Sequence, residues 1–438
     1  MDNVDSKNTY LKLLKIISVY ICMLVCMADC INQKLRRMGR RRFLSTVAGL
    51  GVSGAALNFL TKDAVASVDL DDEVPRLSKL RHTNHEAVLR REEKPQREPI
   101  FYTIPRDEWA VVETAHDAAA QVNSLLEAEG ASDGVTAGVT TVTRGHHSQK
   151  AVIVKRTVNR GEEETIEPTP SKEKLRGMLP DTISGTAGDG NYRRTIDGIP
   201  ITIETEQLSL SSQTQDTSSG PGNYYNHEYR PVPGGSVLQW GDAASFQYGS
   251  GGTPVHDGSN NDYNLVTAGH VIKDEDMYQP ATDDDQHIGS RMDDKHDDPG
   301  TPEPAFDAGV IDLDTDTYHQ FAGASGDDTY WDDVHIFGIV GRDELVDNEN
   351  SDYSLRRRGA RTGMESGTLN EVYDDHHAFD TSADEDDGDS GGPHFMREYN
   401  SGLGIYEAYI AGIHYAGNTK MSRATMMSAI ESEYSVAV

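Results

Sequence analysis

The chain has 438 residues with 72 acidic and 40 basic side chains, a formal net charge of −32 at neutral pH. This length is too great for one ordinary core and allows two domains. The charge argues against nucleic acid and anionic membranes as partners, and it indicates a soluble protein kept apart by self-repulsion. After residue 226 the only lysines are Lys273, Lys295 and Lys420. This composition resembles that of proteins from salt-rich surroundings, where high ionic strength screens the repulsion.

The first 66 residues differ from the rest, because they hold 10 basic and 4 acidic side chains. Residues 39–50, with Arg40-Arg41-Arg42-Phe43-Leu44, resemble a twin-arginine export signal that continues to an A-x-A sequence at residues 64–66. We therefore expect residues 1–66 to be a targeting segment and the protein to be secreted by the twin-arginine route, with no stable membrane partner after removal of the signal. The apolar run at 16–27 is short for a membrane span, so Met38 is a candidate translation start.

All three cysteines, Cys22, Cys26 and Cys30, lie in the targeting segment. A spacing of four places them on one face of a helix. This favours apolar packing over a metal site, because no fourth ligand is in view. The mature protein would then lack cysteine and would depend on its packed core.

Residues 67–207 are expected to form a small α+β region. Its first part, to about residue 104, is polar and of mixed charge, which predicts disorder. A helix follows, with Pro105 before it, Asp107 and Glu108 in its first turn and Gly130 at its end. Runs rich in β-forming residues follow at 138–143, 150–158 and 196–206. Residues 208–222 are rich in Ser, Thr and Gln, and residues 208–230 are predicted to be a linker.

Residues 231–438 contain short apolar runs separated by Gly, Asp and Asn turns. The runs centre near Ser236, Asn264, Ile288, Val310, His335, Thr368, His394 and Ile410. This spacing favours antiparallel β-barrels over alternating strands and helices. Met426, Met427, Ile430 and Tyr434 indicate a final helix. Asp312-x-Asp314-x-Asp316 begins like a calcium loop, but the sixth position is Thr317 and the twelfth is Gly323, so an EF-hand is rejected and no metal site is expected.

Gly388-Asp389-Ser390-Gly391-Gly392-Pro393 is the most specific motif in the chain. A serine hydroxyl becomes nucleophilic only beside a base, and it needs backbone donors for the oxyanion that it creates. The flanking glycines allow a tight turn and a close approach of the Gly388 and Ser390 amides to a substrate carbonyl. The alternative is an acidic glycine-rich turn without chemistry.

The same letters also fit the G-x-S-x-G nucleophile elbow. An elbow needs a helix after the serine, then an acid and a histidine downstream. Here Pro393 follows, residues 394–396 are typical of a strand, and no Asp occurs after Ser390. The elbow is therefore excluded, and the base and the acid should lie upstream.

Two upstream stretches fit these roles. Residues 263–270 read as a buried strand running into a small-residue turn that ends at His270. Asp307 stands at the head of an apolar strand, where it could hold a histidine tautomer. Either residue alone is more often structural, but together with the serine motif they form a candidate His270, Asp307 and Ser390 triad.

These motifs resemble the trypsin/chymotrypsin-like serine proteases, and most closely the bacterial streptogrisin and glutamyl endopeptidase branch. Val266-Thr267-Ala268-Gly269-His270 is similar to T-A-A-H, Asp307-Ala308-Gly309-Val310 to D-I-A-L, and the Ser390 segment to G-D-S-G-G-P. Residues 359–368 resemble G-x-T-T-G-x-x-S-G-T, and residues 412–417 resemble the strand that lines the specificity pocket. The resemblance covers about residues 231–438.

The resemblance implies a mainly β fold: two antiparallel β-barrels of the trypsin-like type with a C-terminal helix, preceded here by the small α+β region. It also implies the substrate-binding residues Asp384, His414, Tyr415 and Gly417. Asp384 stands where a carboxylate would favour Lys or Arg before the scissile bond, whereas His414 resembles the histidine that binds a substrate glutamate. The surrounding acids favour a broad or basic preference.

We therefore expect an exported endopeptidase that acts on proteins or peptides through an acyl-enzyme, with no cofactor. An esterase with the same triad and a non-catalytic binding barrel are the alternatives. The α+β region would be an intramolecular pro-region or a retained accessory domain. Val232-Pro233-Gly234-Gly235 only loosely resembles the N-terminus that inserts beside the Asp before the serine in trypsin, so the partner of Asp389 stays unassigned.

Overall fold

The computed structural model describes residues 72–144, 147–160, 165–166, 170–210, 213–214, 225, 227–242, 245–257, 263–272, 276–281, 284–296, 305–323 and 330–438. The predicted targeting segment and its cysteines lie outside these residues. Within the described part of the chain, no helix has both the length and the apolar character needed to cross a membrane.

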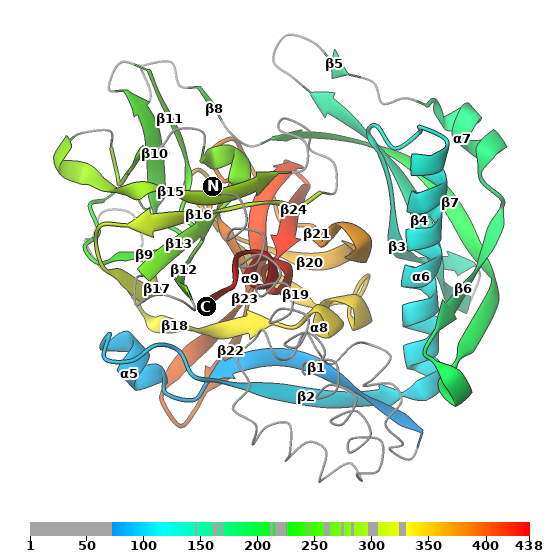
Figure 1. Cartoon of the computed structure of the whole chain (residues 1–438), viewed down its shortest axis with the longest axis horizontal. Coiled ribbons are helices and arrows are strands. Elements are labelled where there is room, and N and C mark those ends of the chain that lie inside the picture. Colours follow the sequence, from blue (N-terminus) through cyan, green and yellow to red (C-terminus); the bar gives the residue numbers. More distant parts are fainter. Residues whose placement is uncertain are drawn as a thin grey trace, which may run out of the picture.

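The first barrel follows the N-terminal region (Figure 1). Its strands are β10 (Val237–Asp242), β11 (Ser245–Ser250), β12 (Thr253–Asp257), β13 (Tyr263–Thr267), β14 (Asp276–Tyr278), β15 (His287–His296) and β16 (Asp307–Leu313). They pair in the order β12-β13-β16-β15-β14-β10-β11, and every pair is antiparallel. Only Gly251 and Gly252 separate β11 from β12. β11 and β12 are therefore two halves of one bent strand, and this continuity closes the strand order into a barrel.

The second barrel closes through its own pairings. Its strands are β19 (Ser354–Gly359), β20 (Gly363–Tyr373), β21 (Ala378–Thr381), β22 (Pro393–Asn400), β23 (Ile405–Asn418) and β24 (Met421–Met426). They pair antiparallel in the order β19-β20-β21-β24-β23-β22, and β22 returns to β19. If β11 and β12 are counted as one strand and the strands of each barrel are numbered along the chain, the two barrels have the same pairing order.

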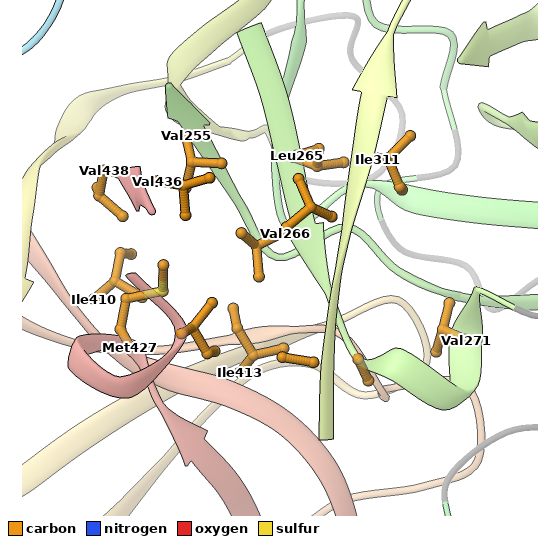
Figure 2. Packing of buried hydrophobic residues seen from close by; sticks show 14 of the residues in the cluster. Val255, Leu265, Val266, Val271, Ile311, Ile410, Ile413, Met427, Val436 and Val438 are labelled. Carbon is orange, nitrogen blue, oxygen red and sulfur yellow. The ribbon is translucent and has the colours of Figure 1, made fainter. Parts of the chain in front are cut away.

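One hydrophobic cluster joins the two barrels. Figure 2 shows Val255, Leu265 and Val266 of the first barrel facing Ile410 and Ile413 of β23. The same cluster includes Met427 of the C-terminal helix α9 (Met427–Tyr434) and Val436 of β25 (Val436–Ala437). Burial of a Val, Leu or Ile side chain stabilises a fold by about 1.5–3 kcal/mol. This shared core therefore fixes the two barrels against each other.

The connection between the barrels adds β17 (Thr317–Ala322), β18 (Tyr330–Val340) and α8 (Arg342–Asp347). β17 pairs in parallel with β9 (Val232–Gly234), and β18 pairs in parallel with β23. Short 3₁₀ turns occur at Gly190–Tyr192 (η1), Gly269–Val271 (η2), Asp284–Gln286 (η3) and Asp374–His376 (η4). The strand predictions near residues 264–410 are confirmed, and Ser236 lies in the turn between β9 and β10.

The N-terminal region has α+β structure. Its elements are β1 (Glu73–His82), α5 (His85–Leu89), β2 (Arg97–Pro105), α6 (Arg106–Ala128), β3 (Val135–Arg144), β4 (His147–Arg160), β5 (Thr165–Ile166), α7 (Lys172–Met178), β6 (Thr182–Ala187), β7 (Arg194–Leu210) and β8 (Gln213–Thr214). The long helix α6 packs on the sheet of β3, β4, β7 and β6 (Figure 1). The predicted helix and the three predicted β-rich runs are confirmed.

The prediction of disorder up to residue 104 is wrong for residues 72–104, which form the β1–α5–β2 hairpin. β1 pairs antiparallel with β2 and with β18. Its charged residues misled the prediction, because Arg76 and Lys79 are buried in ion pairs rather than exposed. Lys79 pairs with Glu398 of β22, and Arg76 pairs with acids of two other elements.

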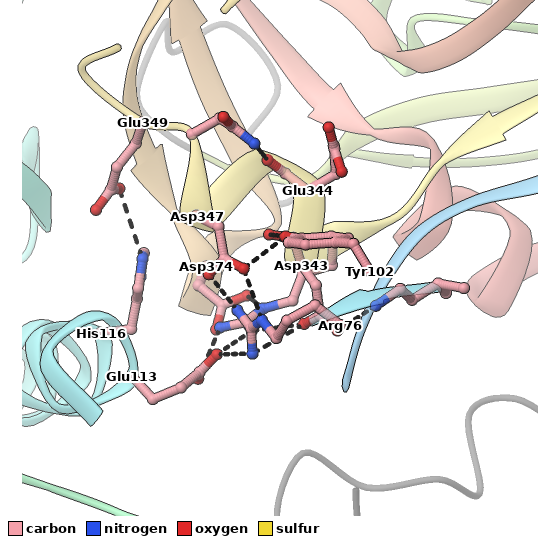
Figure 3. Close-up of polar contacts among 12 residues, drawn as sticks. Arg76, Tyr102, Glu113, His116, Asp343, Glu344, Asp347, Glu349 and Asp374 are labelled. Carbon is pink, nitrogen blue, oxygen red and sulfur yellow. Dashed lines mark hydrogen bonds and ion pairs between the residues drawn. The ribbon is translucent and has the colours of Figure 1, made fainter. Parts of the chain in front are cut away.

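Figure 3 shows the ion pairs that Arg76 makes with α6 and α8. Arg76 lies 2.6 Å from Glu113 of α6 and 2.7 Å from Asp347 of α8. Arg342 lies 2.7 Å from the same Glu113 and 2.6 Å from Asp374. The guanidinium groups of Arg76 and Arg342 thus share the buried carboxylate of Glu113. This contact holds α6 against β1 and α8.

Five histidines meet where the hairpin rests on the barrels: His82 of β1, His85 of α5, His256 of β12, His319 of β17 and His335 of β18. Neighbouring imidazoles in this cluster have ring centroids 5.1–5.9 Å apart. His82 Nε2 is 2.9 Å from the carbonyl oxygen of Val438, the last residue. The hairpin therefore packs against both the barrels and the C-terminus.

The expected fold is confirmed: a mainly β protein with two antiparallel barrels, a C-terminal helix and a preceding α+β region.

Candidate active site

His270 lies in the 3₁₀ turn after β13, where the buried strand predicted from the sequence ends. Asp307 is the first residue of the neighbouring strand β16. His270 Nδ1 is 2.7 Å from Asp307 Oδ2, and the His270 amide donates to Asp307 Oδ1 at 3.1 Å. The two carboxylate oxygens thus hold the backbone and the ring of one residue. This arrangement places the proton on Nδ1 and leaves Nε2 as the basic nitrogen.

Asp307 also contacts the second barrel. Its amide donates to Thr425 Oγ1 at 3.1 Å, and that hydroxyl donates to the Asp307 carbonyl at 2.9 Å. Thr425 belongs to β24. Two hydrogen bonds therefore fix the start of β16 against the barrel that carries Ser390.

Ser390 lies in the loop before β22, and the strand after it confirms the exclusion of the elbow. Its carbonyl accepts from the Ser250 amide at 2.7 Å. A Cβ placed on Gly249 would lie 3.0 Å from the Ser390 carbonyl oxygen and 3.1 Å from the side chain of Val271, the neighbour of His270. The histidine turn and the serine loop therefore flank the same point of β11.

The serine and histidine side chains do not bond each other in this structure. Ser390 Oγ donates to the carbonyl of Tyr415 at 3.1 Å, and the serine is fully buried. Within the described residues, the buried His270 Nε2 has no hydrogen-bond partner. A nucleophile and its base are often poorly aligned without substrate. Rotation of the hydroxyl away from Tyr415 would be needed to engage Nε2.

The loop also supplies two backbone donors. Among the described residues, the Gly388 and Ser390 amides donate no hydrogen bond, whereas the Gly391 and Gly392 amides bond to His414 and Asp389. Gly388 has φ +98°, and a Cβ there would lie 2.2 Å from the ring of Tyr248. Glycine is thus required by backbone conformation and by space. The two amides could serve a developing oxyanion.

The structure identifies the partner of Asp389 that the sequence left unassigned. Asp389 Oδ2 lies 3.0 Å from Arg357 Nη1, and both side chains are fully buried. Thr362 donates to the carboxylate from its amide and its hydroxyl, at 3.0 and 2.8 Å. Burial would raise the pKa of Asp389, but the Arg357 charge and the amide donors outweigh it and the pKa is lowered. Val232 instead lies in β9 and donates to the Asp316 carbonyl.

The expected substrate-binding residues separate into two groups. His414, Tyr415 and Gly417 lie on β23 next to the serine loop and are buried. The Asp384 side chain is exposed, and its carbonyl accepts from Arg357. The next residue, Glu385, is the acid that turns inward, with Oε2 at 3.6 Å from His414 Nε2. Sequence reasoning missed Glu385, although it follows Asp384 directly in the acidic run 384–387.

No protein-family model and no curated protein matches the chain. The solved structures found to be similar include Thermobifida fusca protease A, with 19% identity over 47% of this chain and 97% of that chain and a TM-score of 0.31. An alpha-lytic protease homolog, N4, has 17% identity over 47% of this chain and 98% of its own, also with a TM-score of 0.31. The Rv3671c protease from M. tuberculosis has 11% identity over 44% and 76%, with a TM-score of 0.25. Scores this low carry no argument, and the fold assignment rests on the strand pairings.

Proposed function

We propose that the chain is a serine endopeptidase that cleaves peptide bonds through an acyl-enzyme at Ser390. The observation that carries the proposal is the His270 and Asp307 pair, bonded at 2.7 Å, beside a glycine-bounded serine with two unused backbone donors. His270 Nε2 takes the serine proton and returns it to the leaving amine. Asp307 orients the imidazole, and the Gly388 and Ser390 amides hold the oxyanion.

The experiment is a kinetic comparison in concentrated salt. Ser390→Ala and His270→Ala should each abolish peptide hydrolysis to a similar degree, and the double variant should be little worse, because the residues act as a unit. Near wild-type hydrolysis in either variant contradicts the proposal. A matched pair of a protein substrate and a simple ester separates an endopeptidase from an esterase with the same triad, and absence of both activities in the wild type would indicate a binding barrel.

We also propose that the α+β region acts as an inhibitor in cis. β7 continues from the α+β region into the predicted linker, where Ser209 and Leu210 pair antiparallel with Gly417 and Ala416 of β23. These two residues of β23 directly follow Tyr415, whose carbonyl accepts from Ser390 Oγ. Gln213 then pairs with Tyr248 of β11. One short stretch is therefore tied to both barrels beside the serine, where an extended substrate would have to bind.

A buried ion pair holds β7 against the second barrel. Arg423 of β24 is fully buried and lies 2.7 Å from both Glu206 of β7 and Asp380 of β21. Loss of Glu206 with the α+β region would still leave Arg423 its Asp380 partner, so the barrel could keep a paired cation. Retention of the region as an accessory domain is the alternative. Comparing the intact mass of the secreted, active protein with that of the full chain decides between them.

Export through the twin-arginine route also belongs to the proposal. The signal-like sequence lies outside the described residues, and its support is the Arg40-Arg41 motif followed by an apolar stretch. This route carries folded proteins, for which an inhibitor in cis would protect the cytoplasm.

A further inference from the structure

The N-terminal hairpin, residues 72–105, is built into the sheet of the second barrel (Figure 1). β1 pairs with residues 338–340 of β18, and β18 pairs in parallel with β23. β23 carries Tyr415, whose carbonyl accepts from Ser390 Oγ. Without the hairpin, residues 338–340 would lose these partners and form an exposed strand edge. The hairpin thus extends the sheet that reaches the nucleophile.

Two glycines near the end of β18 make room for the backbone of β1. A Cβ added to Gly338 would collide with the Leu80 carbonyl oxygen, and one added to Gly341 would collide with that of Leu77. The Gly341 amide donates to the carbonyl of Ser78 at 2.7 Å. A glycine allows a second backbone to approach this closely. This segment is therefore shaped to receive the hairpin.

The hairpin also contributes to the apolar core that the two barrels share. Leu80 is buried in the same cluster as Val255 and Ile410, and Leu77 and Phe101 pack against that cluster. The rest of the α+β region has a separate apolar cluster, whose described members all lie between residues 115 and 203. Burial of apolar surface thus assigns the hairpin to the barrels.

Polar contacts join the hairpin to the C-terminal helix. Arg97 Nη1 is 2.5 Å from Glu431 Oε1, and the two side chains are only 4% and 7% exposed. The same carboxylate oxygen accepts from the Val438 amide at 2.9 Å, and His82 contacts the Val438 carbonyl oxygen. Loss of Arg97 would leave a buried carboxylate without this cation, which is strongly destabilising. The hairpin therefore completes the C-terminal end of the second barrel.

Residues 106–210 contact the barrels in a different way. Their links include the ion pair of Lys150 with Glu349 at 2.8 Å and the short pairing of β7 with β23. Val112 of α6 is the described residue of this part that enters the apolar cluster of the second barrel. The two parts of the α+β region meet where Val74 of β1 packs with Trp109 of α6. Residues 106–210 could therefore leave with most of their own core intact.

We propose that the hairpin is a permanent partner of the catalytic barrels and that only residues 106–210 form the inhibitor. The inference rests on the proposed function. Hydrolysis that frees residues 106–210 breaks a peptide bond on each side of them and consumes one water at each. The hairpin then stays bound to the barrels as a separate short chain. The N-terminal region thus has two parts with opposite effects, one that supports the active fold and one that blocks it.

The test is hydrogen exchange of the full chain in molar salt, with two matched truncations of buried side chains. Leu80→Ala, in the hairpin, should lower the protection of the β18 and β23 amides about tenfold or more, because it leaves a cavity in the shared core. Val122→Ala, in α6, should lower the protection of the α6 and β4 amides and leave β1 and β23 unchanged. The proposal is overturned if Leu80→Ala spares β23, or if β1 loses protection together with β4 in Val122→Ala.

The composition of the secreted, active protein provides a second test. Mass spectrometry under denaturing conditions should find residues 72–105 in it, as a separate chain where residues 106–210 are lost. Active protein without residues 72–105 would overturn the proposal.

Failure of the proposed function is seen separately, because hydrogen exchange needs no catalysis. Protection of β1 that follows β23, with no reaction of Ser390 with a sulfonyl fluoride, would keep the hairpin assignment and reject the protease. Reaction of Ser390 with protection of β1 that follows β4 would do the reverse.

Discussion

Arg357 and Asp389 form a fully buried ion pair, with Nη1 of the arginine 3.0 Å from Oδ2 of the aspartate. The pair holds the residue directly before Ser390 from within the chain. Removal of one partner of a buried pair costs about 3–5 kcal/mol, because the other charge stays buried. Arg357→Leu should therefore lower the free energy of unfolding by about this amount and disorder the serine loop.

Denaturant unfolding in molar salt measures this cost. Arg361→Leu is the matched control from the same segment, since its side chain is 41% exposed and lies 3.5 Å from Asp386. An exposed pair contributes at most about 1 kcal/mol. Equal destabilisation by the two variants would contradict the role given to Arg357.

The histidine cluster should make docking of the N-terminal hairpin sensitive to acid. Burial lowers the pKa of His82 to about 3 and of His256 to about 4, and nearby Arg97 and Lys94 oppose protonation further. The undocked pKa is about 6.5. Docking is therefore fully stable above pH 6.5 and weakens as pH falls towards 4, by up to about 1.4 kcal/mol per pH unit for each histidine.

Hydrogen exchange of the β1 and β2 amides in molar salt measures this effect. Protection should fall between pH 6.5 and 4, and His319→Leu, which removes one buried imidazole, should reduce the pH dependence. His377→Asn is the control, because His377 is exposed and has a left-handed φ that Asn tolerates. Protection of β1 that is constant over this range would disprove the prediction.

The acidic excess predicts dependence on salt. The Debye length rises from about 3 Å at 1 M to about 10 Å at 0.1 M, so carboxylates repel one another over longer distances in dilute buffer. The protein should lose structure when salt falls far below molar levels, as followed by circular dichroism. Full activity without added salt would refute this.

Export should depend on the arginine pair. Replacing Arg40 and Arg41 with Lys should leave the protein inside the cell, because twin-arginine signals require the pair. Deletion of residues 1–37 should have no effect if Met38 is the true start. Immunoblots of cells and medium give the answer, and secretion of the double Lys variant would indicate another route.

The sequence was most informative where apolar runs end at a polar residue. The strand before His270, the strand headed by Asp307 and the strand after Pro393 were predicted from such runs and are present as β13, β16 and β22. The hydrophobic pattern of a buried strand is contained in a few consecutive residues, so a short run is enough to predict the strand. The topology of the barrels came from the family resemblance rather than from local pattern.

The sequence was least informative for buried charges. Arg76 and Lys79 made the hairpin look solvated, but their partners are distant in sequence. Arg357 stands within three consecutive arginines, and only tertiary packing shows that it faces Asp389. The run of acids at 384–387 likewise does not reveal that Glu385 turns inward. An ion pair with a residue outside the local segment can bury a charged side chain that local composition predicts to be exposed.

The central claim is that Ser390 is a nucleophile activated by His270. Reaction of the purified protein in molar salt with an organophosphonate or sulfonyl fluoride, followed by peptide mass spectrometry, tests it most directly. We predict one equivalent of label on Ser390, lost in Ser390→Ala and strongly slowed in His270→Ala. If the α+β region inhibits in cis as proposed, the active secreted form should react faster than the full chain. Absence of label on Ser390 in the active secreted form, or equal labelling of His270→Ala, would contradict the account.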